Sequence, residues 1–325
     1  MAASVVKKKI LVVVSDAGGA EIISAFIVAN RKKFNFYCFL NGPAQKIFKR
    51  KKIKFIALAQ SQNAAEVLSA HSQAKLLLTG SSWSTDLELQ FIKAARTIGL
   101  RTATYLDHWV NYRERFGYPR RDWIKNLPDE IWVGDKRAYL LAKKYFQTRS
   151  GVFLQPNRYF EEIKKKYARS PKERSSDLLI VTEPLSEAIN SLGQQLPVKV
   201  TETLWLERIL SFLAQHGFKK KIFLRLHPSE RPDKYDFIVE KFKKILPIKK
   251  TNGDIIRDLK KVGTVFGVTS MALVAAELCR KQVFSIVMDK NLLSFVPQRS
   301  RIHRVTNLQK SGKIIRKLAS ARHGT

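Results

Sequence analysis

Residues 9–30, KILVVVSDAGGAEIISAFIVAN, predict the fold class. Their first part, Lys9–Ser15, is a continuous apolar run rich in valine, which is typical of a strand buried on both faces. Two glycines follow, and the apolar residues of Ala20–Asn30 then recur at helical spacing. A buried strand, a glycine-containing turn and a helix in this order predict the opening unit of a parallel α/β sheet.

The alternation of strand and helix continues outward from this unit over most of the 325 residues. Further strands are predicted at 34–40, 54–58, 75–79, 101–107, 130–133, 152–154, 177–181, 221–226, 264–268 and 283–288. Further helices are predicted at 43–50, 63–71, 86–98, 136–146, 201–216, 235–246, 254–261, 271–279 and 308–320. Because strands connected through helices run parallel, the pattern indicates a doubly wound parallel sheet.

A polar and charged stretch at 156–176 interrupts the alternation, and it predicts a helix followed by a linker. We therefore expect two Rossmann-like lobes. The expected N-terminal lobe spans residues 1–160, the linker 161–176 and the C-terminal lobe 177–325.

The composition limits the class of protein. The chain has 60 Lys and Arg residues against 27 Asp and Glu, a formal net charge of +33, and 45% of its residues are hydrophobic. This hydrophobic content excludes intrinsic disorder for most of the chain. The charge favours phosphate-rich partners, either nucleic acid or anionic lipid. No helix-turn-helix, zinc-finger or RNA-recognition signature accompanies the charge, which disfavours nucleic acid.

Cysteines and apolar runs indicate the compartment. Cys38 and Cys279 lie in apolar runs, so we expect two buried free thiols rather than a disulfide framework or a cysteine-ligated zinc site. The apolar run Ile10–Val14 is shorter than a secretory signal or a membrane span requires. We therefore expect a cytoplasmic protein, with peripheral contact to the inner face of the cell membrane as a further expectation from the charge.

In the first lobe, candidate ligand-binding residues follow two strands. Asp16, Gly18 and Gly19 lie in the turn after the first strand, where glycines let a ligand approach the backbone; an ordinary tight turn is the alternative. The turn lacks the G-x-G-x-x-G spacing, and no acidic residue closes the second strand, which disfavours a nicotinamide dinucleotide. Asp107 ends the strand 101–107 and His108 follows it.

Asp107 is placed where open α/β sheets bind ligands, beyond the carboxyl end of a strand. A carboxylate there is suited to act as a general base towards a sugar hydroxyl, with a helix cap or a salt bridge as the alternative. The long loop that follows, 108–128, interleaves aromatic residues with arginines, a composition that suits sugar rings and phosphate.

In the second lobe, two short motifs suit a phosphate group. Arg225, His227 and Pro228 lie at the end of the strand 221–226, where a histidine can donate to a phosphate oxygen; a surface histidine at a strand end is the alternative. Thr269 and Ser270 lie between a strand and a helix, where hydroxyls and exposed N–H groups can hold phosphate or only cap the helix. No Asp-x-Asp motif and no His/Cys cluster is present, so no metal is predicted.

Together these motifs resemble GT-B glycosyltransferases, in particular bacterial sialyltransferase-like and polysialyltransferase-like enzymes and capsule polysaccharide transferases. The resemblance implies two Rossmann-like lobes facing an inter-domain cleft that binds a nucleotide-activated donor. It implies that His227 contacts the donor phosphate and that Thr269 and Ser270 hold the same phosphate. It implies that Asp107 takes the place of the family's general base, with Asp16 as the competing candidate. The chain departs from the family in reading Asp107-His108-Trp109 instead of two acids and a glycine, and in carrying Ala275 where many relatives carry Glu.

The expected function is therefore glycosyl transfer in surface polysaccharide or glycolipid synthesis. A nucleotide-sugar is the substrate, no cofactor is expected, and the acceptor is a lipid-linked or saccharide molecule. Two alternatives remain open at this point: a nucleotide-sugar epimerase of the same fold, and a non-catalytic degenerate GT-B protein that only binds.

Overall fold

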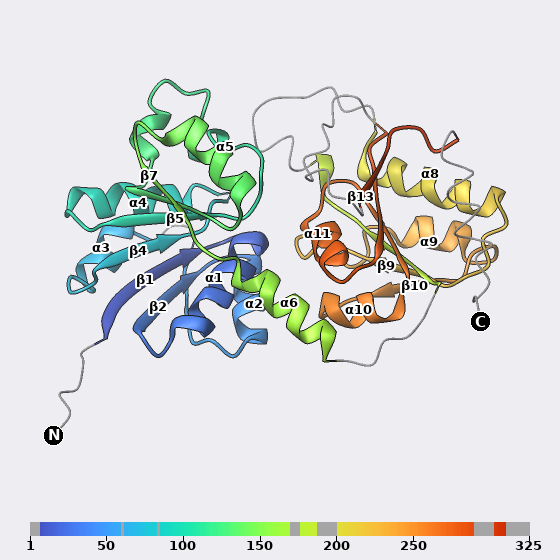
Figure 1. Cartoon of the computed structure of the whole chain (residues 1–325), viewed down its shortest axis with the longest axis horizontal. Coiled ribbons are helices and arrows are strands. Elements are labelled where there is room, and N and C mark those ends of the chain that lie inside the picture. Colours follow the sequence, from blue (N-terminus) through green and yellow to red (C-terminus); the bar gives the residue numbers. More distant parts are fainter. Residues whose placement is uncertain are drawn as a thin grey trace. The chain divides into compact units, whose positions relative to one another are not determined.

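The computed structural model describes residues 7–59, 62–82, 85–169, 176–186, 200–288 and 302–309 (Figure 1). The chain divides into two compact units, Met1–Glu161 and Glu162–Thr325. The division falls within helix α6 (Arg158–Ala168), close to the start of the linker expected at 161–176. Most of the helix predicted at 308–320 lies outside the described residues.

The N-terminal unit is built on a parallel sheet with the strand order β3-β2-β1-β4-β5-β6-β7. The strands are β1 (Lys8–Val14), β2 (Phe34–Leu40), β3 (Ile56–Ala57), β4 (Leu76–Thr79), β5 (Thr102–Leu106), β6 (Glu130–Val133) and β7 (Gly151–Leu154). The strand order reverses between β1 and β4, which pair in register from Ile10 with Leu76 to Val13 with Thr79. Ligands of open α/β sheets bind beyond the carboxyl ends of the strands at such a reversal.

Helices cover both faces of this sheet because successive side chains of β1 point to opposite sides. The side chains of Val12 and Val14 pack in one core with α1 (Ala17–Asn30) and α2 (Pro43–Arg50). Those of Leu11 and Val13 pack in a second core with α3 (Ala64–Ser69) and α4 (Leu87–Thr97). Helix α5 (Lys136–Phe146) contacts β6 and β7.

The C-terminal unit repeats the topology with the strand order β10-β9-β8-β11-β12-β13. Its strands are β8 (Leu178–Val181), β9 (Ile222–Arg225), β10 (Ile248–Thr251), β11 (Thr264–Gly267), β12 (Gln282–Ile286) and β13 (Ile302–Val305), and every pairing is parallel. The predicted fold class, two Rossmann-like α/β lobes, is therefore confirmed. The reversal point of this unit lies between β8 and β11.

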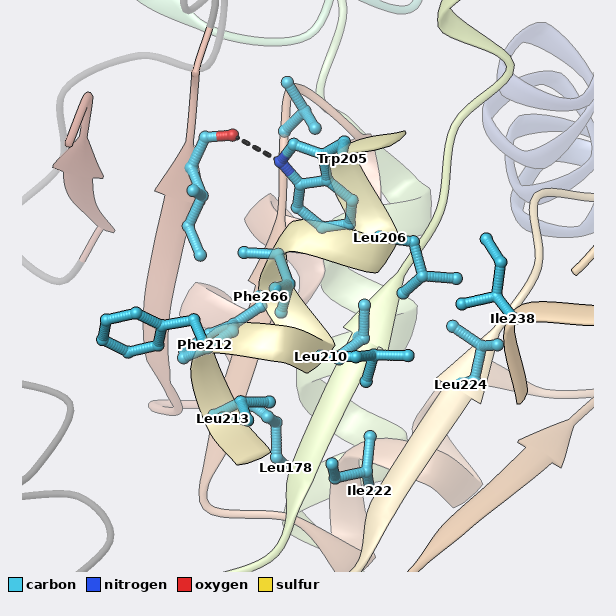
Figure 2. Close-up of a cluster of buried hydrophobic side chains, with 14 of the residues drawn as sticks. Leu178, Trp205, Leu206, Leu210, Phe212, Leu213, Ile222, Leu224, Ile238 and Phe266 are labelled. Atoms are coloured by element: carbon cyan, nitrogen blue, oxygen red, sulfur yellow. Dashed lines mark hydrogen bonds between the residues drawn. The ribbon is translucent and has the colours of Figure 1, made fainter. Parts of the chain in front are cut away.

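One face of the second sheet packs against α8 (Glu202–Gln215) and α9 (Asp236–Phe242). Figure 2 shows this core, in which Trp205, Leu206 and Leu210 of α8 belong to one cluster with Leu224 of β9 and Ile238 of α9. The Trp205 indole N–H donates to the carbonyl of Ile286 at 2.8 Å, so its one polar atom is satisfied inside the core. The remaining helices are α10 (Ile255–Lys261) and α11 (Met271–Leu278), and α11 contacts β11 and β12.

Cys38 and Cys279 are free and buried, and burial raises the pKa of both thiols to about 12. In the described ranges, none of the helices combines the length and the hydropathy that a membrane span requires.

Candidate functional site

Three carboxylates gather at the reversal point of the N-terminal unit. Asp16 follows β1, Glu88 lies in the first turn of α4 after β4, and Asp107 follows β5. Glu88 is buried, and one of its oxygens accepts from the backbone N–H of Ser15 at 2.8 Å and from the Ser15 hydroxyl at 2.7 Å. These bonds join the turn after β1 to the start of α4.

Asp16 caps helix α1, because its Oδ1 accepts from the backbone N–H of Gly19 at 2.9 Å. The two glycines of this turn make room for the carboxylates. A Cβ at Gly18 would lie 1.8 Å from Asp107 Oδ2, and one at Gly19 would lie 2.6 Å from Asp16 Oδ1. The structure therefore brings Gly18 and Gly19 together with both carboxylates that the sequence singled out.

Arg115 holds the third carboxylate in place. Its Nη1 lies 2.8 Å from Asp107 Oδ1, and it also donates to the hydroxyl and the carbonyl of Ser81 at 2.7 and 2.8 Å. The Arg115 side chain is 4% exposed and that of Asp107 is 10% exposed. Asp107 thus forms a nearly buried ion pair, which was the alternative left open for it.

Three of the five aromatic residues in the loop after β5 belong to the core, contrary to the expectation that the aromatic residues of 108–128 face a ligand. Trp109, Tyr112 and Phe116 are buried, and the Trp109 indole donates to Asp135 at 2.8 Å. His108 is half-buried with its ring 5.5 Å from that of Trp109. The loop folds inward because its large apolar rings gain more from burial than from solvent.

The cluster described above has three carboxyl groups, Asp16, Glu88 and Asp107, but, among the residues that the structure describes, only one cation, Arg115. Burial, together with the charges of Asp107 and Glu88, raises the pKa of Asp16 well above its usual range, and burial also raises the pKa of Glu88. A carboxyl group whose pKa is raised keeps its proton to higher pH than an ordinary carboxyl, which suits it to proton transfer. Asp16, with its raised pKa, thus lies near Asp107, which is held as a carboxylate by Arg115. Acid–base catalysis commonly uses two carboxyl groups whose surroundings differ in this way.

At the reversal point of the C-terminal unit, the start of α11 holds an anion that belongs to the chain itself. The Glu183 carboxylate, directly after β8, accepts from the backbone N–H groups of Val268, Thr269 and Ser270 at 3.2, 2.6 and 2.6 Å. The Thr269 hydroxyl also donates to it at 2.5 Å. Burial raises the pKa of Glu183. We call these four donors the α11 seat.

The Ser270 side chain caps α11 by accepting from Ala272 N–H at 3.2 Å. Thr269 and Ser270 therefore lie where the sequence places an anion, but a carboxylate of the chain occupies the position. Sequence reasoning missed Glu183. Its signal was its place two residues after Val181, at the end of the strand that neighbours β11.

His227 lies at the end of β9, half-buried, with Nδ1 2.8 Å from the Ser229 hydroxyl. Its backbone N–H donates to the buried Glu230 carboxylate at 2.9 Å, and Tyr235 and Thr182 also donate to Glu230. The loop after β9 is thereby fixed to the end of β8.

The other two residues of this motif have different surroundings. The Arg225 guanidinium is engaged by Asp258 at 2.8 Å and by the carbonyl of Gly253 at 2.7 Å. Pro228 is exposed. Within the described ranges, no three acidic, histidine or cysteine side chains are grouped as a metal site requires.

Removing the internal anion should make the α11 seat available to a free one. Glu183→Ala takes the Glu183 acceptor away from all four donors of the α11 seat, so we expect a loss of about 2–3 kcal/mol of stability without phosphate. Inorganic phosphate at about 100 times its Kd would return about 2.7 kcal/mol by mass action. Thermal unfolding at increasing phosphate concentration measures the effect.

Asp254→Ala is the matched control, because it removes the carboxylate that caps α10 through Ile256 N–H but leaves the α11 seat filled. It should lose about 1 kcal/mol and gain no phosphate dependence. An equal phosphate response in the Glu183→Ala variant and the wild type would contradict the prediction.

The two Rossmann-like units are the architecture of the GT-B fold, and solved structures with this fold match the chain. No protein-family model matches the sequence, and no curated protein sequence is significantly similar to it.

Among solved structures, the chain is similar to the UDP-GlcNAc 2-epimerase of Methanocaldococcus jannaschii in complex with UDP-GlcNAc and UDP. The TM-score is 0.66 at 11% identity, over 97% of this chain and 94% of that one. It is also similar to HepE of Anabaena in complex with UDP and glucose, with a TM-score of 0.63 at 10% identity, over 96% and 90% of the two chains. A third is the glycosyltransferase of kitacinnamycin, with a TM-score of 0.55 at 10% identity, over 97% and 91%. At these identities the likeness shows the fold.

Proposed function

We propose that the chain is a glycosyltransferase whose donor is a nucleotide-activated sugar. The observation that carries the proposal is the α11 seat, where three backbone N–H groups and one hydroxyl converge on a single anionic group. Such a set of donors at the start of a helix binds phosphate oxygens as readily as a carboxylate. The donor phosphate would displace Glu183 and take its place.

The leaving group of glycosyl transfer is the nucleotide phosphate, on which negative charge develops as the sugar departs. N–H groups that already point at this position stabilise the charge without reorganising, because the backbone of β11 and α11 fixes them. In our proposal Thr269 and Ser270 carry this role together with His227, while Arg225 supports the edge of β9 through Asp258.

The acceptor hydroxyl must lose its proton as it attacks. We assign this proton to Asp16, whose raised pKa suits a general base better than the ion pair of Asp107 does. In this proposal Asp107 supplies the fixed negative charge beside Asp16. His108 would line the same site, and the acceptor would be a saccharide or a lipid-linked sugar of surface polysaccharide or glycolipid synthesis.

A nucleotide-sugar 2-epimerase is the second candidate. Asp16 and Asp107 have unequal surroundings, one carboxyl favouring its proton and the other held by Arg115, and such a pair can remove a proton at one step and return it at another. Several of the structural neighbours are UDP-GlcNAc 2-epimerases, which makes UDP-GlcNAc the first substrate to test. The sialyltransferase-like specificity expected from the motifs stays a prediction.

The deciding experiment has two stages. A thermal-shift panel of CMP-, UDP-, GDP- and CDP-sugars identifies the nucleotide, since a ligand that binds only the folded protein raises its unfolding temperature. Product analysis with and without a saccharide acceptor then separates the classes. An elongated acceptor supports transfer, a 2-epimer without acceptor supports epimerisation, and binding with no product on any donor indicates a non-catalytic protein.

His227→Ala should weaken binding of the identified nucleotide-sugar about tenfold, the value of one charge-assisted hydrogen bond to phosphate. Titration calorimetry measures the affinity. His216→Ala is the matched control, because His216 ends α8 before the start of β9, whereas His227 follows the end of β9, and it should leave the affinity unchanged. Unchanged donor binding in the His227→Ala variant would remove this histidine from the phosphate site.

A further inference from the structure

Helix α5 presents an outward face on which an apolar side chain is surrounded by cations. Leu140 is 59% exposed, and Lys136, Arg137, Lys143 and Lys144 are exposed around it. Each of the four cations is three or four residues away from Leu140 in the sequence. Residues at these spacings are neighbours on a helix surface, so the five side chains form one continuous face. Ala138, Ala142 and Phe146 occupy the buried face. We call the five outward residues the α5 patch.

The cations of the α5 patch are not neutralised by carboxylates. The helix contains no acidic residue, and among the described residues none of its four cations is within ion-pair distance of a carboxylate. The nearest acid in sequence, Asp135, uses its oxygens to cap α5 and to accept from Trp109. The patch therefore carries about four positive charges at neutral pH.

Helix α9 provides a contrast within the same chain. Its Phe237 is 63% exposed, but acidic residues lie on both sides of it. Lys241 pairs with Glu207, Lys243 with Glu240, and Lys250 with Asp236. Both helices therefore expose an apolar residue. Of the two, α9 has its nearby lysines paired with carboxylates, whereas the described contacts show no such pairing around Leu140 of α5.

Neighbouring segments extend the character of the α5 patch. The guanidinium of Arg113 lies 4.1 Å from the ring centre of Tyr118 and 5.3 Å from that of Tyr145, which ties the loop after β5 to the end of α5. Two residues after Tyr118, this loop exposes Arg120 and Arg121.

We propose that the α5 patch docks the protein on an anionic lipid bilayer, with α5 lying along the surface and Leu140 inserted among the headgroups. A helix with cations flanking an exposed apolar residue gains both electrostatic attraction and apolar burial at such a surface. Nucleic acid fits less well, because Leu140 at the centre of the face would lie against charged phosphates. The proposal stands independently of the glycosyltransferase assignment.

Co-sedimentation of the full chain with vesicles tests the proposal. Vesicles of phosphatidylcholine with one third phosphatidylglycerol should bind the protein, binding should fall as salt is raised, and pure phosphatidylcholine should bind little. Replacing Lys136, Arg137, Lys143 and Lys144 with Gln should lower partitioning more than tenfold, since each cation near an anionic surface is worth roughly a fivefold change. Leu140→Gln, with no change of charge, should lower it several-fold.

The matched control replaces four exposed lysines elsewhere, Lys32, Lys33, Lys244 and Lys249, with Gln. It removes the same charge and should keep most of the binding. Equal losses in the patch and control variants would overturn the proposal in favour of diffuse charge, as would an absence of vesicle binding in the wild type. Single-stranded DNA that displaces the protein from vesicles at low concentration would favour nucleic acid instead.

Discussion

Asp16→Asn is expected to lower turnover by a factor of about 10²–10⁴, the usual contribution of a general acid or base. Asn keeps the shape of the side chain and still caps α1 through Gly19 N–H, so the fold is preserved while the proton acceptor is lost. Steady-state kinetics on the nucleotide-sugar found by thermal shift measure the effect. Asp122→Asn, an exposed carboxyl on the loop after β5, is the control and should keep full activity.

The Asp16→Asn variant should also be more stable than the wild type at high pH. Because the folded pKa of Asp16 is raised, the folded state binds its proton more tightly than the unfolded state does. That stability is fully present below the ordinary carboxyl pKa and is lost as pH rises through the raised value. Asn is neutral throughout, so the gain in unfolding temperature should appear above this range and vanish well below it.

Asp107→Asn separates the two candidate bases. If Asp16 is the base, Asp107→Asn reduces turnover less than Asp16→Asn. The limb of the pH profile is kept but moves to lower pH, because the Asp107 charge no longer raises the pKa of Asp16. The reverse order of effects, with the limb of the pH profile lost in Asp107→Asn alone, would return the role of base to Asp107.

Arg115→Met is expected to destabilise the N-terminal unit by about 3–5 kcal/mol, because it leaves the Asp107 carboxylate nearly buried without its partner. The carbonyl and hydroxyl of Ser81 lose a donor in the same step. Urea unfolding, with the midpoint and slope both fitted, measures the loss.

Two further variants show whether the loss comes from the unpaired charge. Arg120→Met removes an exposed arginine of the same loop and should change stability by less than about 0.5 kcal/mol. Arg115→Met combined with Asp107→Asn should recover part of the loss, since no charge is then left unpaired. A single variant as stable as the control would mean that solvent reaches Asp107 freely.

The fold was predictable because its signals are local and repeated. The run Lys9–Ser15 and the glycines after it indicate a buried parallel strand, and the alternation that follows fixes the doubly wound class. The strands β10 and β13 escaped prediction, because Ile248–Thr251 and Ile302–Val305 are short and half polar, as strands near the sheet edges often are. Their place depends on pairing with β9 and β12, which a linear pattern does not show.

The site was predictable only in part, for a reason of the same kind. Asp16, Asp107 and His227 follow strands, so the end-of-strand rule finds them. The partners at these strand ends are set by the fold: Arg115 reaches Asp107 from the loop after β5, Glu88 of α4 accepts from Ser15 beside Asp16, and Glu183 after β8 accepts from Thr269. The prediction that the aromatic residues of 108–128 face a ligand failed for Trp109, Tyr112 and Phe116, because aromatic side chains are equally suited to a core and to a sugar surface.

Glu183 also sets a minimum binding free energy that a ligand must exceed to displace it from the α11 seat. Because the backbone holds this carboxylate beside its donors, it competes at an effective concentration fixed by the chain, of the order of millimolar or above. A lone phosphate ion gains only the four donors that Glu183 already satisfies, so it displaces the carboxylate poorly. A larger ligand that brings further contacts of its own can exceed the threshold, and the seat thereby discriminates by the whole molecule rather than by its phosphate.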